Sequence, residues 1–532
     1  MKLLLAIAAV CAAAASGVAD AKPFRWSSQG DLQTSDPHSQ NENLTNLFAQ
    51  QVHDTLVMRD KKLAIVPGLA LSWARLNDTT WRFVLRQGVR FHDGAPFTAD
   101  DVVFSIERAQ HPNSLLRQYA NLLGKPRRID DHTVELVQAD PNPILLQHAT
   151  LIYIMSKAWS ARHRVEQPLD FKSGQDSYAA RHAMGTGPWM LVAREPDVKT
   201  VLRRNPNWWG KHEGNITEIT YRPIQSDATR TAALFSGQLD FVLDPPPQDV
   251  ARIKAHPDLK VVEGTENRVV FFGFDQHRDE LVYSNVKGKN PFKDKRVRQA
   301  VYHAIDIEAL RTKTMRGSAV PTGGITPSIL ASNPDAERRL PYDPAAAKRL
   351  LAEAGYARGF EVGMHCPNNR YINDEEICVA VASMLARVGI QVKVTTQPRA
   401  TYFPRLERYD TSFYMLGWGG AITDAQPTLS PVLRSYDKAS GQGNYNYGRY
   451  SNPKLDALID AAAKEMNPDK RSGLIREALA MHNENVYHVP LHRQVIPWAM
   501  RRNVNVVHLA NNWVMGEWVT IDDNNAQRGA SR

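Results

Sequence analysis

The residues that could do catalytic chemistry do not fall into any catalytic pattern. The chain contains no Gly-x-Ser-x-Gly nucleophile turn, no His-Glu-x-x-His helix, no P-loop and no Gly-x-Gly-x-x-Gly after a strand. Its 17 histidines are scattered singly. The adjacent acids Asp100-Asp101 and Glu375-Glu376 would point in different directions on a helix, which does not suit general acid–base catalysis. We therefore expect a binding protein that is not an enzyme and that holds no cofactor and no metal.

A strand that ends in glycines is the best candidate for a binding site. The apolar run from Tyr414 continues into Gly417-Trp418-Gly419-Gly420-Ala421, and Asp424 is the nearest acid. Glycines let a ligand approach the backbone closely, and an indole can stack on a ligand or exclude water from it. The alternative for Trp418 is packing in the core.

A second polar segment, Pro367-Asn368-Asn369-Arg370-Tyr371, also follows the end of a predicted strand. Ligands of open α/β sheets bind at such strand ends. We expect Asn369 and Arg370 to face a ligand, although an exposed structural arginine is an equal alternative. Four further residues are predicted to face the same site: Gln29, Asp31, Arg268 and Tyr445.

The stretch 81–109 shows most clearly how the chain builds the elements around such a site. Apolar residues at 81, 83 and 85 predict a half-buried strand, and Asp93-Gly94 predicts a turn. Thr98 is a natural helix N-cap, and the acids at 100 and 101 lie where the helix dipole favours negative charge. The stretch therefore reads as strand, turn and capped helix.

The stretch 81–109 closely resembles the most recognisable segment of the family 5 extracellular solute-binding proteins, the dipeptide, oligopeptide and nickel receptors of ABC importers. Three further elements resemble the same family: the Gly-Thr-Gly-Pro turn at 185–188, the Asn-Pro-x-Trp-Trp loop at 205–209 and the Leu-x-Ser-Gly-x-Leu-Asp helix end at Asp240. The resemblance covers nearly all of residues 24–520.

The resemblance implies an α/β, two-lobed periplasmic binding protein fold with an extra subdomain in lobe I and a ligand cleft between the lobes. It places lobe I at 22–275, with the subdomain at about 50–180, lobe II at 276–495, and a C-terminal return to lobe I at 496–532. The alternation of helices and strands over 345–395 independently predicts a layer of parallel strands in lobe II.

The resemblance also assigns roles in the cleft, where the family's Gly-Trp loop lies. Peptide-binding members often place an aspartate at the position of Ala421, where it holds the ligand's α-ammonium group. Members use an arginine near Arg370 for the ligand carboxylate, through two charge-assisted hydrogen bonds, and Arg370 lies about two residues beyond that position. Without the aspartate, ordinary dipeptide recognition is not expected. An amino-blocked peptide, an opine, a glutathione-like peptide and a metal chelate all remain open.

The first 21 residues predict export. A basic start, an apolar run and Ala19-Asp20-Ala21 fit a cleaved signal peptide, so we expect a mature chain that begins at Lys22 in the periplasm. No later stretch reaches the roughly 18 uninterrupted apolar residues of a membrane span. The net charge of +9 is dispersed, which indicates a solvated surface rather than a nucleic-acid site. For Cys366 and Cys378, a bridge and two buried thiols both remain open.

These observations predict the periplasmic substrate-binding protein of an ABC importer. It would capture a peptide-like or other small polar solute by lobe closure and deliver it to a membrane permease, as a monomer and without nucleic acid. Two alternative functions remain open. A secreted hydrolase would need a nucleophile and a base that converge in the cleft. A peptide-holding, chaperone-like protein would bind weakly and promiscuously, without lobe closure.

Overall fold

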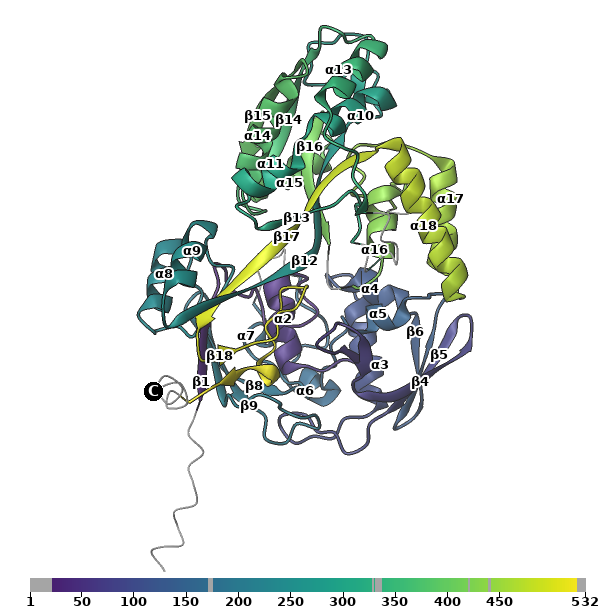
Figure 1. Ribbon diagram of the computed structural model, residues 1–532. Coiled ribbons are helices and arrows are strands. Elements are labelled where there is room, and N and C mark those ends of the chain that lie inside the picture. Colours follow the sequence, from purple (N-terminus) through teal and green to yellow (C-terminus); the bar gives the residue numbers. More distant parts are fainter. Residues whose placement is uncertain are drawn as a thin grey trace, which may run out of the picture.

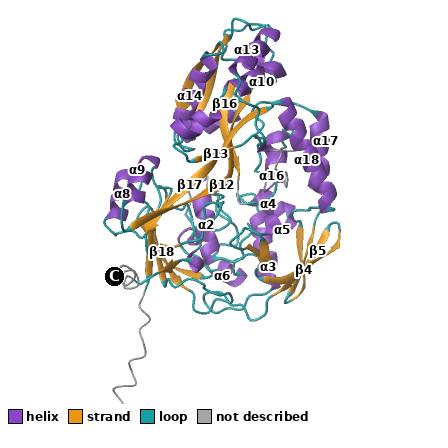
Figure 2. Ribbon diagram, in the orientation of Figure 1, coloured by secondary structure: helices purple, strands orange, loops and turns teal. Residues whose placement is uncertain are grey.

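The computed structural model describes residues 22–170, 176–327, 330, 337–419, 422–438 and 442–523. The predicted signal peptide, residues 1–21, lies outside this part of the chain. Figure 1 shows a narrow upper part and a broader lower part, which two long strands connect. Figure 2 shows that helices and strands mix in both parts, in agreement with the α/β class that the sequence predicts.

One 11-stranded sheet runs through both parts of the molecule. Its strands are, in spatial order, β15 (Ile390–Gln397), β14 (Phe360–Pro367), β16 (Phe413–Gly419), β12 (Leu259–Phe274), β17 (His488–Arg501), β11 (Phe241–Leu243), β1 (Pro23–Ser27), β10 (Glu218–Tyr221), β9 (Lys199–Arg204) and β8 (Trp189–Glu195), with β13 (Ala319–Pro321) beside β17.

The two central strands, β12 and β17, connect the upper and lower parts (Figure 1). They pair with each other antiparallel from Leu259↔Arg501 to Gly273↔His488. The upper half of β12 also pairs with β16, and the lower end of β17 pairs with β11. The apolar run 269–274 is buried throughout, as its lack of polar residues predicts. The polar ends of other strands lie beside this pair of strands, β12 and β17, which we call the ribbon.

The upper part contains the predicted parallel layer. Strand β14 pairs parallel with β15 across helix α14 (Asp374–Ala386), and α10 (Lys295–Ala304) and α13 (Pro344–Glu353) complete the same core. The sequence pattern predicts a helix over 372–388 here, but the helix begins only at Asp374. Asn373 is in the left-handed region with φ of 53°, which excludes it from the helix.

A helical group lies beside the upper end of the ribbon in Figure 1. It consists of α15 (Arg399–Glu407), α16 (Gln426–Thr428), α17 (Pro453–Lys464) and α18 (Pro468–Asn485). These helices share a core with Tyr414 and Leu416 of β16, so the end of β16 lies between two packed layers.

The lower part holds a four-stranded sheet of its own, in the order β4 (Ala70–Asn77), β5 (Thr80–Leu85), β7 (Thr133–Val137) and β6 (Lys125–Asp130). Helix α3 (Ala99–Gln110) follows β5, and Thr98 and Asp101 form the capping box at its start. Strand, turn and helix therefore occur in the predicted order, because each signal is local. The amphipathic pattern of residues 44–58 predicts a helix as far as Met58. Helix α2 (Asn43–Val52) ends earlier, since Thr55 forms a β-bridge with Tyr153.

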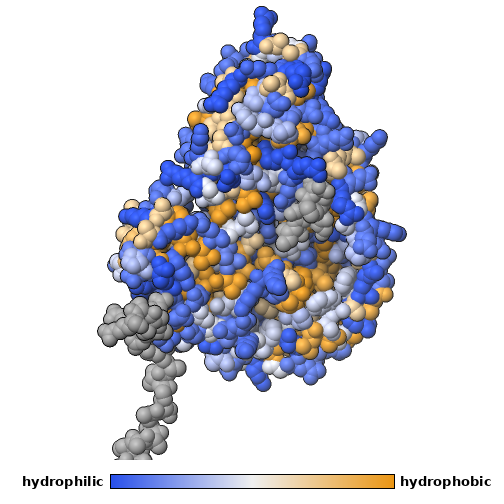
Figure 3. All heavy atoms as spheres, viewed as in Figure 1, coloured by the Kyte–Doolittle hydropathy of each residue, from blue (hydrophilic) through white to orange (hydrophobic). Residues whose placement is uncertain are grey.

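The remaining helices and short strands are β2 (Val57–Arg59), β3 (Ile65–Pro67), α4 (Arg117–Leu122), α5 (Leu145–Ala149), α6 (Lys157–Arg162), α7 (Tyr178–Arg181), α8 (Asp227–Phe235), α9 (Pro247–Ala255), α11 (Ile307–Ala309), β18 (Val504–Asn505) and β19 (Thr520–Ile521). Within the described ranges, no helix is long and apolar enough to cross a bilayer. Figure 3 shows apolar side chains gathered near the centre of this face, between the two parts.

Candidate functional site

The predicted glycine-ended strand is β16, and its end lies against β12. Gly417, Trp418 and Gly419 are in register with Val270, Val269 and Arg268. Packing already explains both glycines. A Cβ at 417 would lie 2.6 Å from the ring of Tyr371, and a Cβ at 419 would lie 2.1 Å from the backbone oxygen of Asn267. A close approach of ligand to these glycines stays a prediction.

Trp418 forms an aromatic wall with a neighbouring loop. Its indole Nε1 donates to the backbone oxygen of Pro427 at 2.7 Å, which fixes the ring. The ring centroid lies 4.5 Å from that of Tyr445, whose side chain is 41% exposed. Two amphipathic rings at the edge of the core can cover an apolar part of a ligand while their polar atoms stay satisfied.

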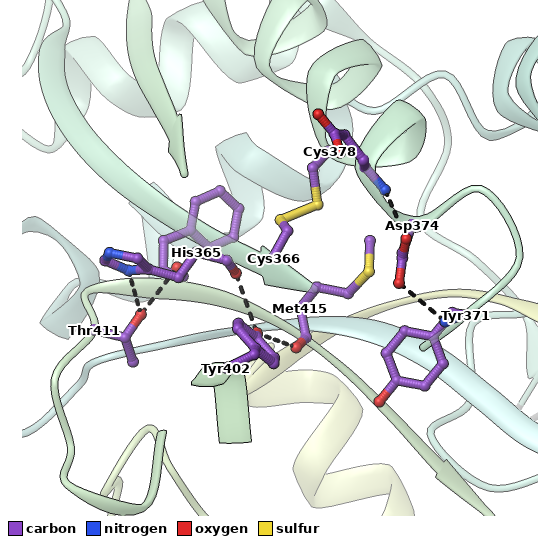
Figure 4. The surroundings of a disulfide bond; sticks show 10 residues. His365, Cys366, Tyr371, Asp374, Cys378, Tyr402, Thr411 and Met415 are labelled. Carbon is purple, nitrogen blue, oxygen red and sulfur yellow. Dashed lines mark hydrogen bonds between the residues drawn. A yellow bond between two sulfur atoms is a disulfide. The ribbon is translucent and has the colours of Figure 1, made fainter. Parts of the chain in front are cut away.

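The loop that carries Arg370 is tied down on both sides. A disulfide joins Cys366, in β14, to Cys378, in α14, and closes the segment between them. One carboxylate oxygen of Asp374 accepts the backbone N–H groups of Arg370 and Tyr371 at 2.9 and 3.0 Å. Figure 4 shows Asp374 and Tyr371 beside the disulfide. The structure thus favours the bridge over the two free thiols that the sequence left open.

Tyr371 connects the Arg370 loop to the end of β16. Its hydroxyl accepts from the backbone N–H of Gly417 at 2.7 Å and lies 3.4 Å from the oxygen of the same residue. The next residue, Ile372, donates its N–H to the Oε1 of Gln494 in β17 at 3.0 Å. One short loop is therefore linked to both neighbouring strands of the sheet.

The Arg370 guanidinium itself has no anionic partner. Among the described residues, no hydrogen bond or ion pair involves its side-chain nitrogens, and its charge lies 5.2 Å from the centroid of the Tyr371 ring. Burial lowers the pKa of Arg370, and the nearby positive charge of Arg268 lowers that pKa further. A fixed backbone thus holds a cation that forms no ion pair within the described part of the chain, although the charge of Glu266, itself paired with Arg268, acts on it from a distance.

Arg268, by contrast, is neutralised by an acid on its own strand. Its side chain forms an ion pair with Glu266 at 3.0 Å, and Gln494 donates a hydrogen bond to the same carboxylate. Burial opposes ionisation of Glu266, yet the charge of Arg268 and these hydrogen bonds hold its pKa below the ordinary value. The net charge beside the end of β16 is therefore that of Arg370.

The two acids of the predicted site are both engaged elsewhere. Asp424 binds Arg471 through two hydrogen bonds of 2.8 Å. Asp31 forms an ion pair with Arg194 of β8 at 3.1 Å and also accepts the backbone N–H of Asp197. Neither carboxylate is free to hold a ligand ammonium group.

Six of the twelve predicted site residues come together: Gly417, Trp418, Gly419, Arg268, Arg370 and Tyr445. Asn369 is exposed nearby and accepts the backbone N–H of Arg399 at 2.7 Å. Gln29 is exposed, and both Gln29 and Asp31 follow β1. In the sheet, β1 is separated from β16 by three strands, β12, β17 and β11, and lies on the side of β8. Gly420 and Ala421 lie outside the described residues.

Sequence reasoning missed three polar residues of this region. Glu266 precedes Arg268 by two positions on one strand, where side chains share a face, so that spacing could have revealed the pair. Tyr371 belongs to the polar segment 367–371, but the sequence pattern assigned no role to it. Gln494 contacts the loop from a strand 122 residues away, and no local pattern could have indicated this contact.

The described residues contain no group of three or more His, Cys, Asp or Glu side chains that could hold a metal ion. The buried histidines make other contacts: His38 contacts the backbone oxygen of Tyr153 at 2.9 Å, and the rings of His482 and His488 contact each other at 2.9 Å. The chemistry of the site is thus a guanidinium, two aromatic rings and backbone groups, which suits recognition of an anion attached to an apolar body.

Comparison with known proteins gave consistent matches. The family described as bacterial extracellular solute-binding proteins, family 5 Middle, matches residues 64–440. Heme-binding protein A of Haemophilus influenzae is 29% identical over 464 residues, which cover 82% of this chain and 81% of the relative. Glutathione-binding protein GsiB of Salmonella typhi is 27% identical over 457 residues and 84% of each chain. The solved structure of HbpA2 from Haemophilus parasuis has a TM-score of 0.79, with 22% identity, over 94% of this chain and 100% of that one.

Proposed function

Because this chain belongs to the bacterial extracellular solute-binding proteins of family 5, we propose that it binds a solute bearing a carboxylate, which Arg370 holds, and passes that solute to an ABC permease. Proteins of this family capture peptides and related ligands for ABC importers. Membership leaves the individual ligand open, since the two relatives named above are binding proteins for heme and for glutathione.

One observation carries the proposal: the predicted site has a free cation and no free acid among the described residues. Arg370 lacks an anionic partner, whereas Asp31, Asp424 and Glu266 each pair with an arginine. A carboxylate can form two charge-assisted hydrogen bonds with a guanidinium. An α-ammonium group would find no such partner here, and an uncompensated buried charge is costly.

The ligand class that fits is a carboxylate compound that needs no counter-charge for an amino group. An amino-blocked peptide, an opine or a modified peptide meets this condition. The aromatic pair Trp418 and Tyr445 would cover the apolar part of such a ligand. Arg268, already neutralised by Glu266, would orient the site rather than bind the anion.

The transport cycle follows from the two crossing strands. The proposed lobes are residues 22–275 and 276–495, with 496–532 returning to the first, and β12 and β17 would form the hinge between them. Closure around the solute would present a new surface to the permease. Export through the signal peptide at 1–21, a periplasmic location and a monomeric state belong to the same proposal.

The test compares solutes that differ only in one charge. Purified protein is heated with N-acetyl-dialanine, its C-terminal amide, glutathione and octopine, because a ligand that binds only the native state raises Tm. We expect N-acetyl-dialanine to raise Tm and its amide to have no effect, and glutathione, which keeps a free α-ammonium group, to raise Tm less than N-acetyl-dialanine. The Arg370→Ala variant should abolish the shift, whereas Arg387→Ala, an exposed arginine at the end of α14, should retain it.

An equal shift with the amide, or an undiminished shift in Arg370→Ala, would contradict the role of Arg370. If native mass spectrometry finds no bound solute and none of the compounds shifts Tm, the assignment of a carboxylate ligand fails.

A further inference from the structure

A cavity lies in the lower part of the molecule, next to the residues that follow β16. The space between its walls, open solvent included, is about 450 Å³. Its walls are largely apolar and include Met58, Leu63, Leu151, Trp513 and Trp518. Methionine and tryptophan side chains adapt well to an apolar ligand surface, since the first is flexible and the second presents a broad flat face.

One charged side chain in the cavity wall, Arg59 at the end of β2, has only neutral partners. Its Nη1 donates to the backbone oxygen of Leu63 at 3.0 Å and to the hydroxyl of Thr423 at 2.7 Å. Its Nη2 donates to Oε1 of Gln147 at 2.5 Å. Among the described residues, no carboxylate lies within ion-pair distance of this guanidinium. Burial lowers the pKa of Arg59 to about 10, and no acid offsets that effect.

The acids that also line the cavity do not neutralise Arg59. Asp60 accepts the backbone N–H groups of Lys62 and Ala64 at 2.8 and 2.9 Å, so it fixes the β2–β3 turn. Glu517 is 2% exposed, and the acids and base that act on it most strongly are Asp54, Glu213 and Lys61. Enclosed charges in proteins are normally paired, so an unpaired guanidinium in a cavity wall calls for an anion.

The cavity adjoins the site that contains Arg370. Arg59 reaches Thr423, only four residues beyond Gly419. On the other side, Asn267 donates its N–H to the backbone oxygen of Ala510 at 3.0 Å, and the backbone oxygen of Asn267 lies directly beside Gly419. The Arg370 loop meets the same strand end through Tyr371. Arg59 is thus linked to the segment that follows β16 through Thr423, and the Arg370 loop is linked to β16 itself through Tyr371.

We propose that Arg59 is a second anion-binding residue, which takes a carboxylate of the solute while the adjoining apolar part packs against Met58, Trp513 and Trp518. This inference rests on the proposed function and narrows the solute to an apolar body that carries two carboxylates, one for Arg59 and one for Arg370. The flat guanidinium fork matches a planar carboxylate better than it matches a point charge. Without solute, Thr423 and Gln147 hold the side chain in place.

The first test uses three probes that differ at one end. N-succinyl-phenylalanine carries two carboxylates on an aromatic body, its succinamide analogue carries one, and N-(3-phosphonopropionyl)-phenylalanine replaces the second carboxylate by a phosphonate. Affinities are measured by isothermal titration. We expect wild type to bind the dicarboxylate about 10- to 100-fold more tightly than the amide, as hydrogen bonds to charged groups imply. Preference for the phosphonate over the dicarboxylate would overturn the choice of carboxylate.

Arg59→Gln separates this inference from the function on which it rests. The variant should lose the preference for the dicarboxylate and keep the wild-type affinity for the amide, whereas Lys62→Gln, an exposed residue on the same turn, should change neither. Arg370→Ala should weaken both probes. Retained preference in Arg59→Gln, with binding still dependent on Arg370, would overturn the role of Arg59 alone.

Ligand-free stability gives a second result that needs no probe. If the function of Arg59 is to bind a solute, its unpaired charge destabilises the ligand-free protein. Arg59→Gln should then keep or raise Tm. A lower Tm in the variant would show that Arg59 is a structural bridge to Thr423 and Gln147, and would overturn the inference even if none of the probes binds wild type.

Discussion

Two arginines of this molecule stand in opposite surroundings. Arg108 of α3 and its partner Asp36 have side chains that are 0% and 1% exposed, and two hydrogen bonds of 2.6 and 2.8 Å join them. Arg108 also donates to the backbone oxygen of Val165. Arg370 lies in a loop whose backbone is equally well fixed, yet no described acid meets its guanidinium. The first arginine completes a fold, and the second is left for a ligand.

The contrast teaches how to separate structural from functional charge in this family. Burial alone does not distinguish the two arginines, because both guanidinium groups are largely desolvated. The partner does: a carboxylate from a distant segment compensates Arg108, and burial together with the charge of Arg268 lowers the pKa of Arg370 without such compensation. Arg59 belongs with Arg370 by the same criterion.

The largest effect is expected when the structural pair is broken. Asp36→Asn leaves the Arg108 charge buried and uncompensated, which should lower the free energy of unfolding by about 3–5 kcal/mol. Arg370→Ala should leave that free energy nearly unchanged, because it removes no ion pair. Chemical denaturation of both ligand-free variants checks the contrast, and equal losses would remove it.

The disulfide should have the next largest effect. Replacing Cys366 and Cys378 together by serine frees a segment of 12 positions and should cost about 3 kcal/mol of unfolding free energy. Because the segment carries Arg370, affinity for a carboxylate solute should fall as well. A reductant should reproduce both losses in wild type and change nothing in the double variant. Full affinity without the bridge would show that Asp374 and Tyr371 suffice to place Arg370.

Two buried acids without a basic partner should make the protein less stable as pH rises. Burial raises the pKa of Asp54 to about 6 and that of Glu517 to about 8, above ordinary values of 3.8 and 4.5. At pH values between the unfolded-state pKa and the raised folded-state pKa, the native state binds more protons than the unfolded state. These two acids therefore lower stability between about pH 4 and pH 8, by about 1.4 kcal/mol per pH unit for each proton of difference. The buried histidines act in the opposite direction below about pH 6.5, because burial lowers the pKa of His53, His148 and His482 to about 4, so a net fall is expected only above that pH.

Denaturation across that range measures the slope. Glu517→Gln should flatten the fall in its upper part, and Asp54→Asn should make the slope of its lower part more positive. Asp36 provides the internal comparison. Burial opposes its ionisation, but the charge of Arg108 lowers its pKa, so this carboxylate should contribute nothing to the slope over the same range. Slopes that both substitutions leave unchanged would contradict the assignment of the two unpaired acids.

The sequence predicted those features that depend on neighbouring residues. The turn and capped helix after β5 were found because Asp93-Gly94 and Thr98 act within a few positions. The parallel layer of β14 and β15 was found because the alternation of helix and strand is regular. The start of α14 was wrong by two residues, since the left-handed Asn373 has no clear signal in the sequence.

The state of the site could not be predicted, because it is decided by contacts between distant segments. Asp424 was the nearest acid in the sequence, but Arg471, 47 positions away, occupies it. Asp31 meets Arg194 from 163 positions away. Each contact changes a candidate ligand group into a structural one. Arg59 could not be recognised as a candidate from the sequence, because the absence of an acidic partner is visible only in three dimensions.

The most direct test of the account is a thermodynamic cycle on one ligand pair. Isothermal titration would measure a carboxylate solute, identified first by native mass spectrometry, and its C-terminal amide, each with wild type and with Arg370→Ala. The account predicts that the amide and the alanine variant each lose about 2 kcal/mol and that the two losses do not add, because they remove the same interaction. Additive losses would contradict it, since the carboxylate would then be bound elsewhere.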